Sequence, residues 1–332
     1  MEMAQAIKLL TADGSVTIAN ADWPSMGITA SNLEVPIYLK DGIVRFVYAG
    51  KPEGQNAPSP MTVNTGTVNI SGLSVDLTEA DPRLNAPKDY LFAQNIAINN
   101  VLAARCGKYI PLFSNASSAS GLLSATLVEC NRLPLSQLAT QNVKANDGTA
   151  KVVWSVQQVQ IGSPVVNALL EVLSKSEAGS SLRGDIKDAT ISVANGKVTQ
   201  DTTLSLGENA GRAIRFAGGV DMTSLKLNDF IVNLPTSLLK QFSKDLAKYL
   251  PAGVDVGLKG LVTSPQLDLG NSVNKMFGDA AKKALMGNLL GGDKNDKGGD
   301  KTQPSDQKAV DPIGGLLDQL GKKKDKKKKK DN

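Results

Sequence analysis

The chain has 332 residues, of which only 4% are aromatic and none is histidine. The absence of histidine excludes Ser-His-Asp and Cys-His nucleophilic sites, histidine zinc sites and the commonest general base. The formal net charge of +5 comes from the C-terminal lysines, because the chain without residues 322–331 has 29 basic and 30 acidic side chains; the folded part is therefore not predicted to carry a basic nucleic-acid-binding patch.

Residues 1–90 are predicted to form a β-meander, the N-terminal part of the fold. In LEVPIYLKDGIVRFVY, residues 33–48, two apolar-rich strands meet at Asp41-Gly42, a dipeptide typical of a hairpin turn. Over residues 63–77, β-branched and apolar residues alternate with Thr, Asn and Ser. This alternation predicts strands with one apolar and one polar face.

Between residues 89 and 115 the apolar residues follow mainly helical spacing, up to the helix-breaking Pro111. Two later blocks each consist of strands followed by a short helix, which begins at Ser163-Pro164 in the first block and at Pro235 in the second. The strands of these blocks and of the closing segment are predicted at residues 120–130, 150–161, 188–206 with a turn at Asn195-Gly196, 212–222, 224–234 and 254–269.

The C-terminal sixty residues are predicted to lie outside the folded core. Residues 271–292 have the pattern of an amphipathic helix, and residues 293–332 have the composition of a disordered linker with a lysine-rich tail. The tail can be a solvated charge run, an anchor to anionic lipid headgroups or a nucleic-acid-binding arm. The candidate membrane-surface residues are Lys322, Lys323, Lys324, Lys326, Lys327, Lys328, Lys329 and Lys330.

No motif for catalysis is present. The chain has no Walker A loop, no strand-linked GxGxxG, no GxSxG and no HExxH. Acidic residues such as Asp41 and Asp185 stand beside glycine and lysine, which is typical of turns, and two tryptophans provide little platform for a carboxylate-based glycan enzyme. We therefore expect a protein that is not an enzyme, with no cofactor and no metal.

Cys106 and Cys130 are the two cysteines of the chain, and their separation of 24 residues is too long for a CxxC motif. From spacing alone, two buried thiols and a disulfide in an oxidising compartment both remain open.

Five segments together resemble a known family. They are INNVLAARCGKYIPLFSNASSASGLLSATLVECNRLPL (98–135), KVVWSVQQVQIGSPVVNALLEVL (151–173), DATISVANGKVTQDTTLSL (188–206), IRFAGGVDMTSLKLNDFIVNLP (214–235) and GLKGLVTSPQLDL (257–269). Their order, with turn glycines between alternating apolar residues, resembles the C-terminal region of AsmA-like proteins, relatives of the TamB-type envelope proteins. The resemblance covers residues 91–270, and residues 1–90 fit as further strands of the same kind.

The resemblance implies a mainly β protein with a few short helices, in which a long antiparallel sheet curls into an apolar groove. Such proteins are usually anchored in the inner membrane, project into the periplasm, and are associated with outer-membrane biogenesis and phospholipid movement. The present sequence lacks the N-terminal transmembrane segment of that family and a signal peptide, so we expect any anchor or export signal to lie upstream in a longer protein. Envelope localisation also favours a disulfide between Cys106 and Cys130.

We therefore expect a periplasmic, membrane-associated protein whose partners are phospholipid or a membrane surface, other envelope proteins, and no nucleic acid. The alternative is a structural or assembly module that binds envelope proteins by strand addition. The same apolar face can also be a packed core, which alternation does not distinguish from a groove. The predicted groove residues are Val35, Ile37, Leu39, Ile191, Val193, Ile214, Phe216, Val220, Leu225 and Leu227.

Overall fold

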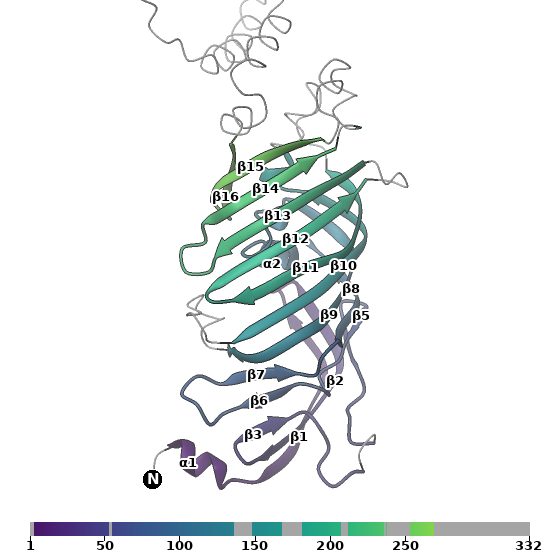
Figure 1. Ribbon diagram of the computed structural model, residues 1–332. Coiled ribbons are helices and arrows are strands. Elements are labelled where there is room, and N and C mark those ends of the chain that lie inside the picture. The colour runs from purple at the N-terminus through teal and green to yellow at the C-terminus, as the bar shows by residue number, and fades with distance from the viewer. Residues whose placement is uncertain are drawn as a thin grey trace, which may run out of the picture. The chain divides into compact units, whose positions relative to one another are not determined.

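The structure is a computed structural model that describes residues 3–52, 55–135, 148–167, 181–206, 212–235, 237 and 253–268 (Figure 1). All of these residues belong to one compact unit, Met1–Asp268. The predicted amphipathic helix at 271–292, the tail at 293–332 and the helix after Pro235 lie outside the described residues, apart from Ser237.

A single antiparallel sheet of sixteen strands forms the fold, which confirms the predicted mainly β architecture. The sheet is curled, and a short helix lies inside the curl (Figure 1). The strands are β1 (Ala12–Trp23), β2 (Ile28–Lys40), β3 (Ile43–Arg45), β4 (Met61–Val63), β5 (Gly66–Val68), β6 (Ser74–Asp76), β7 (Arg83–Ala86), β8 (Tyr90–Ile98), β9 (Ser118–Pro134), β10 (Thr149–Gly162), β11 (Leu182–Ala194), β12 (Lys197–Ser205), β13 (Ala213–Asp221), β14 (Leu227–Leu234), β15 (Val254–Leu261) and β16 (Ser264–Asp268). The helical segments within the described residues include α1 (Met3–Lys8), α2 (Asn100–Cys106) and the 3-10 turn η1 (Pro111–Phe113).

Hairpin turns join neighbouring strands where the sequence predicts them. Asp41 and Gly42 have φ of 55° and 77°, and Asn195 and Gly196 have φ of 52° and 71°. Two successive residues with positive φ make a type I′ turn, whose twist matches that of the flanking strands. Both predicted turns are therefore confirmed.

Between β2 and β9 the sheet splits into two parallel paths of strands. One edge of β2 pairs with β1 along its length, and the other edge pairs with β4 at Ala30 and with β3 near Leu39. One edge of β9 pairs with β10, and the other pairs with β8 near Leu123 and with β7 near Leu133. Two sets of three strands, β3-β6-β7 and β4-β5-β8, therefore each connect β2 to β9; we call these sets the two arms.

The helical expectation for residues 89–115 is wrong for its first part, because Tyr90–Ile98 is strand β8. Ala93 and Ile96 are both buried, and the register with β9 shifts between them at Asn95, which has φ of 55°. A bulge of this kind places residues i and i+3 on the same face of a strand and so imitates helical spacing. The helix begins only at Asn100.

The predicted helix start at Ser163-Pro164 is confirmed for its first turn. Residues 164–167 are helical, the N–H of Val166 donates to Ser163 Oγ (3.3 Å), and the N–H of Asn167 donates to the Ser163 carbonyl (2.8 Å). Serine caps the free N–H groups and proline fixes the first helical φ, as the sequence pattern predicts.

Candidate functional site

An apolar surface runs across one face of the sheet, which we call the inner face. It is defined by residues that pair across successive strands and therefore share a face. Three rows from β8 or β9 to β13 or β14 define it: Ile96, Leu123, Val156, Ile186, Leu204 and Ile214; Leu127, Val152, Ile191, Gln200 and Gly218; and Cys130, Ala150, Val193, Val198, Val220 and Leu227.

Two shorter rows complete the inner face between these three. One consists of Ala93, Ala125, Trp154 and Ala189, and the other of Thr202, Phe216, Val232 and Val256. No residue of the five rows is charged, so the face is suited to uncharged, apolar contacts.

Nine of the ten predicted groove residues lie on faces that the pairing register connects. Leu39 is linked through Val44, Val75 and Leu84 to Leu133 of β9. Leu133 in turn packs in one apolar cluster with Cys130 and Ala150, with Val193 against it. Val35 and Ile37 alternate with Leu39 on β2 and so share its face. The six remaining residues of the nine, on β11, β13 and β14, are Ile191, Val193, Ile214, Phe216, Val220 and Leu227.

Leu225 is the exception and corrects the prediction. It lies in the turn between β13 and β14, with φ of 53°, and its N–H donates to the Asp221 carbonyl (2.8 Å). The strand expected over residues 224–234 begins only at Leu227, because the side chain of Asp221 accepts hydrogen bonds from Ser224 and organises the turn.

Exposure divides the inner face into two parts. Ile214, Phe216 and Val220 have 0–1% of their surface exposed, as in a packed core. Ile191 and Val193 are partly exposed, as are Val35, Ile37 and Leu39. The closed core therefore covers β12–β14 and extends to Val156 and Ile186 on β10 and β11, which expose 0% of their surface. Partly exposed apolar side chains lie on β2 and at Ile191 and Val193 of β11.

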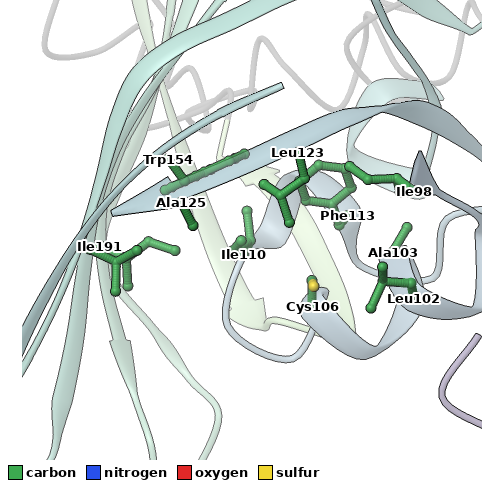
Figure 2. A pocket seen from close by; sticks show the side chains of 11 residues that line it. Ile98, Leu102, Ala103, Cys106, Ile110, Phe113, Leu123, Ala125, Trp154 and Ile191 are labelled. Atoms are coloured by element: carbon green, nitrogen blue, oxygen red, sulfur yellow. The ribbon is translucent and has the colours of Figure 1, made fainter. Parts of the chain in front are cut away.

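A cavity of about 170 Å³ opens over β9–β11 (Figure 2). The side chains of α2 and of the segment around Ile110 lie on one side of it, and those of the sheet lie on the other. Its lining residues are Ile98, Leu102, Ala103, Cys106, Ile110, Phe113, Leu123, Ala125, Val152, Trp154 and Ile191. Cys106 is the only one of these lining residues with a titratable group, so the cavity is suited to an uncharged, apolar ligand group.

Polar contacts fix α2 over the cavity. Asn99 caps the helix by accepting from the N–H of Leu102 (2.9 Å), and its own Nδ2 donates to the carbonyl of Gly27 (2.7 Å). A Cβ at Gly27 would overlap Asn99, so the close approach requires glycine. Arg105 Nε donates to the carbonyl of Ser25 (2.9 Å), which holds the other end of the helix.

Two aromatic rings meet beside the cavity. The ring centroids of Phe113 and Trp154 are 6.0 Å apart, at an interplanar angle of 49°. This tilted geometry is favourable for aromatic pairs and joins η1 to β10. The sequence pattern did not reveal Phe113, Leu102 or Ile110 as site residues, because they come from short helical segments and not from the alternating strands.

The two cysteines lie in different surroundings as free thiols, so the structure does not contain the predicted disulfide. Cys106 lines the cavity, and burial raises its pKa. Cys130 is buried in the apolar cluster with Leu133 and Ala150. Burial, with a smaller contribution from the nearby Glu129 carboxylate, raises the pKa of Cys130 to about 11. Both thiols are therefore protonated at neutral pH.

Across the described ranges, no group of three or more Cys, Asp or Glu side chains could hold a metal ion. In the same ranges no helix combines the length and apolar character needed to cross a membrane. The eight candidate membrane-surface lysines lie outside the described residues.

Neither the models of protein families, nor the curated proteins, nor the solved structures match this chain. The resemblance to AsmA-like proteins therefore stays a prediction from the quoted segments.

Proposed function

We propose that this protein is a non-enzymatic cell-envelope protein that binds phospholipid by its acyl chains, in the periplasm and next to a membrane. The observation that carries the proposal is the accessible, uncharged cavity between α2 and β9–β11, which continues into the apolar inner face. The resemblance to AsmA-like proteins supports the cellular setting and a part in outer-membrane biogenesis.

The size of the cavity sets what it can hold. Apolar cavities of about 150 Å³ stay free of water and bind a molecule such as benzene. A cavity of about 170 Å³ therefore takes a short stretch of one acyl chain and not a whole lipid. Each buried methylene contributes about 0.8 kcal/mol relative to water. Relative to a bilayer the gain is near zero, which suits a protein that both accepts and releases lipid.

Lipid extraction and native mass spectrometry of the purified protein test the proposal. We expect co-purified phospholipid in the wild type and several-fold less in the variant Ala125→Leu, because the larger side chain fills the cavity from the sheet side. Ala217→Leu is the matched control: Ala217 pairs with Asp201 and Ile231 on the opposite face, so retention should be unchanged. Wild-type protein free of lipid after gentle purification would contradict lipid binding.

A second candidate function, strand addition to other envelope proteins, is favoured by β1. Within the described part of the chain β1 pairs only with β2, and ten of its twelve residues are exposed. Val16 and Trp23 expose 48% and 43% of their surface. A long edge strand with free backbone groups and apolar side chains on an open surface is a template for another strand.

Crosslinking in cell envelopes distinguishes this candidate from lipid binding. With a photoreactive residue at Thr17, we expect a protein adduct that disappears in the variant Val16→Lys, because charge on an edge strand opposes pairing. The same residue placed at Asp185, in the centre of the sheet, is the control. Equal labelling from both positions would rule out a docking edge at β1.

A further inference from the structure

Three large apolar side chains are exposed on the turn between β1 and β2 and on the adjoining helix α2. Trp23 and Met26 in the turn and Val101 on the helix expose 43%, 43% and 42% of their surface. Single exposed apolar residues are common, but several on adjoining elements are typical of an interaction surface.

Hydrogen bonds hold the turn against the helix, so the three side chains belong to one surface. The carbonyl of Trp23 accepts from the N–H of Met26 (2.9 Å), which closes the turn. Side chains from both ends of α2 donate to carbonyls of the same turn. A Cβ placed on Gly27 would lie 2.9 Å from the Cβ of Val101, so turn and helix are in direct contact.

The turn and the start of α2 lie at a rim of the sheet, where several strands end. The side-chain amide of Asn64, in the turn between β4 and β5, donates to the carbonyls of Gly27 (2.8 Å) and Ala97 (3.2 Å). Ala97 is the last residue but one of β8. The ends of β1, β4 and β8 therefore gather at this rim, beside the exposed side chains.

Two basic side chains adjoin the apolar ones. Arg105 and Lys108 are exposed, and within the described residues neither forms an ion pair. Both line a shallow depression of about 410 Å³ on the outer side of α2. Its lining residues are Ser25, Asn100, Val101, Ala104, Arg105 and Lys108. We call Trp23, Met26, Val101, Arg105 and Lys108 the rim patch.

Carboxylates are missing from this part of the sequence. Between Asp89 and Glu129 the only charged residues are Arg105 and Lys108. In the turn, Asp22 precedes Trp23 on β1, and alternation along a strand directs the two side chains to opposite faces. The rim patch therefore combines apolar side chains with positive charge.

This combination complements the surface of an anionic membrane. Tryptophan favours the boundary between headgroups and acyl chains, and apolar neighbours can enter the same layer. Arginine and lysine reach from such a position to anionic headgroups.

We propose that the protein docks on an anionic phospholipid membrane through the rim patch. The helix α2 contributes residues both to this patch and to the cavity wall, so docking brings the membrane within about one helix diameter, roughly 10 Å, of the cavity. The inference rests on the proposed function, because the docked membrane would supply the lipid whose acyl chain enters the cavity.

The two tryptophans of the chain allow a direct test, because Trp23 is exposed and Trp154 lines the cavity. The full-length wild type and Trp23→Phe are mixed with saturating vesicles of phosphatidylglycerol and phosphatidylcholine, the latter brominated on its acyl chains. Bromine quenches an indole that touches those chains. We expect the fluorescence of Trp23, taken as the difference between the two proteins, to lose about half of its intensity or more, because a docked indole lies at the acyl boundary.

Charge variants measure the contribution of the two cations. Arg105→Gln together with Lys108→Gln should weaken vesicle binding about 5- to 30-fold, as the loss of two cations near an anionic surface gives. Lys108→Gln alone keeps the contact of Arg105 with the turn and should weaken binding up to about 5-fold. The matched control, Lys151→Gln together with Arg183→Gln, removes the same charges from exposed positions on β10 and β11 and should leave binding nearly unchanged.

The outcomes separate docking from lipid uptake. Absence of vesicle binding, binding without quenching of Trp23, or equal losses in the patch and control variants overturns docking through the rim patch, whose apolar residues would then fit a protein partner. Quenching of Trp154 in Trp23→Phe reports an acyl chain in the cavity and so supports the proposed function in either case. Quenching of Trp23 alone supports docking and contradicts entry of the chain into the cavity.

Discussion

At the scale of single residues, Cys106 places a reactive group in the wall of the cavity. Burial raises the pKa of this thiol, so little of the nucleophilic thiolate is present at neutral pH. A bound acyl chain would cover the same sulfur. The thiol is thus a built-in reporter of occupancy.

We expect iodoacetamide at pH 8 to modify Cys106 more slowly than a cysteine in the unfolded chain, and at least several-fold more slowly again after loading with dioleoyl phosphatidylcholine. Peptide mass spectrometry over time gives the rate. Cys130 is the internal control, because it lies in the cluster with Leu133 and not in the cavity. The same rate at Cys106 with and without bound lipid would show that the chain does not enter this cavity.

Cys130 is expected to make the folding stability depend on pH. Its folded pKa is raised from 9.0 to about 11, so the folded state holds the proton more tightly than the unfolded state. The resulting stability is complete below pH 9 and is lost as the pH rises from about 9 to 11. In urea unfolding, the stability of the wild type should therefore fall more steeply over this window than that of Cys130→Ala. Parallel pH profiles for the two proteins would contradict the assignment.

Residue-level prediction from sequence succeeded where a side chain has one local role. Asp41-Gly42 and Asn195-Gly196 formed the turns that their positive φ preference predicts. Sequence alternation does not predict that Trp154 and Gln200 are buried, with 4% and 5% of their surface exposed, because the burial of polar side chains depends on how the strands assemble.

At the scale of elements, irregularities in the strands decide which face a side chain takes. Gly218 has φ of 154° and lies where the register of β13 against β14 shifts, and a Cβ there would overlap Phe230. The position therefore needs glycine for two reasons: its backbone conformation is unfavourable for other residues, and Phe230 leaves no space for a Cβ.

Gly218→Ala should destabilise the protein by about 1–3 kcal/mol, measured by urea unfolding, because it combines an unfavourable φ with a steric overlap. Gly14→Ala is the matched control, since a Cβ at Gly14 meets nothing within 4 Å. The control should change stability by no more than about 0.5 kcal/mol. Similar effects at both positions would mean that the bulge in β13 tolerates a side chain.

The same irregularities explain which elements could not be predicted. Long strands such as β9 and β10 are predictable from the sequence, because alternation persists over many residues. For β8 the sequence predicts a helix, because the bulge places apolar residues such as Ala93 and Ile96 three positions apart on one face. The helix α2, with only seven residues, depends on its contacts with Ser25 and Gly27, which lie more than seventy residues away in sequence.

At the scale of the whole molecule, charge and apolar surface are separated along the chain. The rows of the inner face carry no charge, whereas eight lysines lie between residues 322 and 330. Near an anionic surface each lysine contributes up to about 1 kcal/mol. We expect this tail to recruit the protein to a membrane surface, where the cavity can exchange lipid.

Replacing the eight lysines with glutamine lowers the formal net charge from +5 to −3. We expect this variant to bind vesicles with 30% anionic lipid at least tenfold more weakly than the wild type, as a loss of more than about 1.4 kcal/mol requires. Vesicle flotation measures the difference, and the wild-type binding should weaken with added salt. Binding that responds to neither the lysines nor salt would exclude an electrostatic anchor.

The two arms between β2 and β9 also affect how the sheet resists a pulling force. A force that pulls β2 away from β9 is shared by β3-β6-β7 and β4-β5-β8, so both arms must yield before the two strands separate. The ladders from β9 to β16 follow one another in series, and any one of them can yield alone. Under tension the sheet should therefore open first on the C-terminal side of β9, at the end that carries the closed core over β12–β14, while the N-terminal arms still hold.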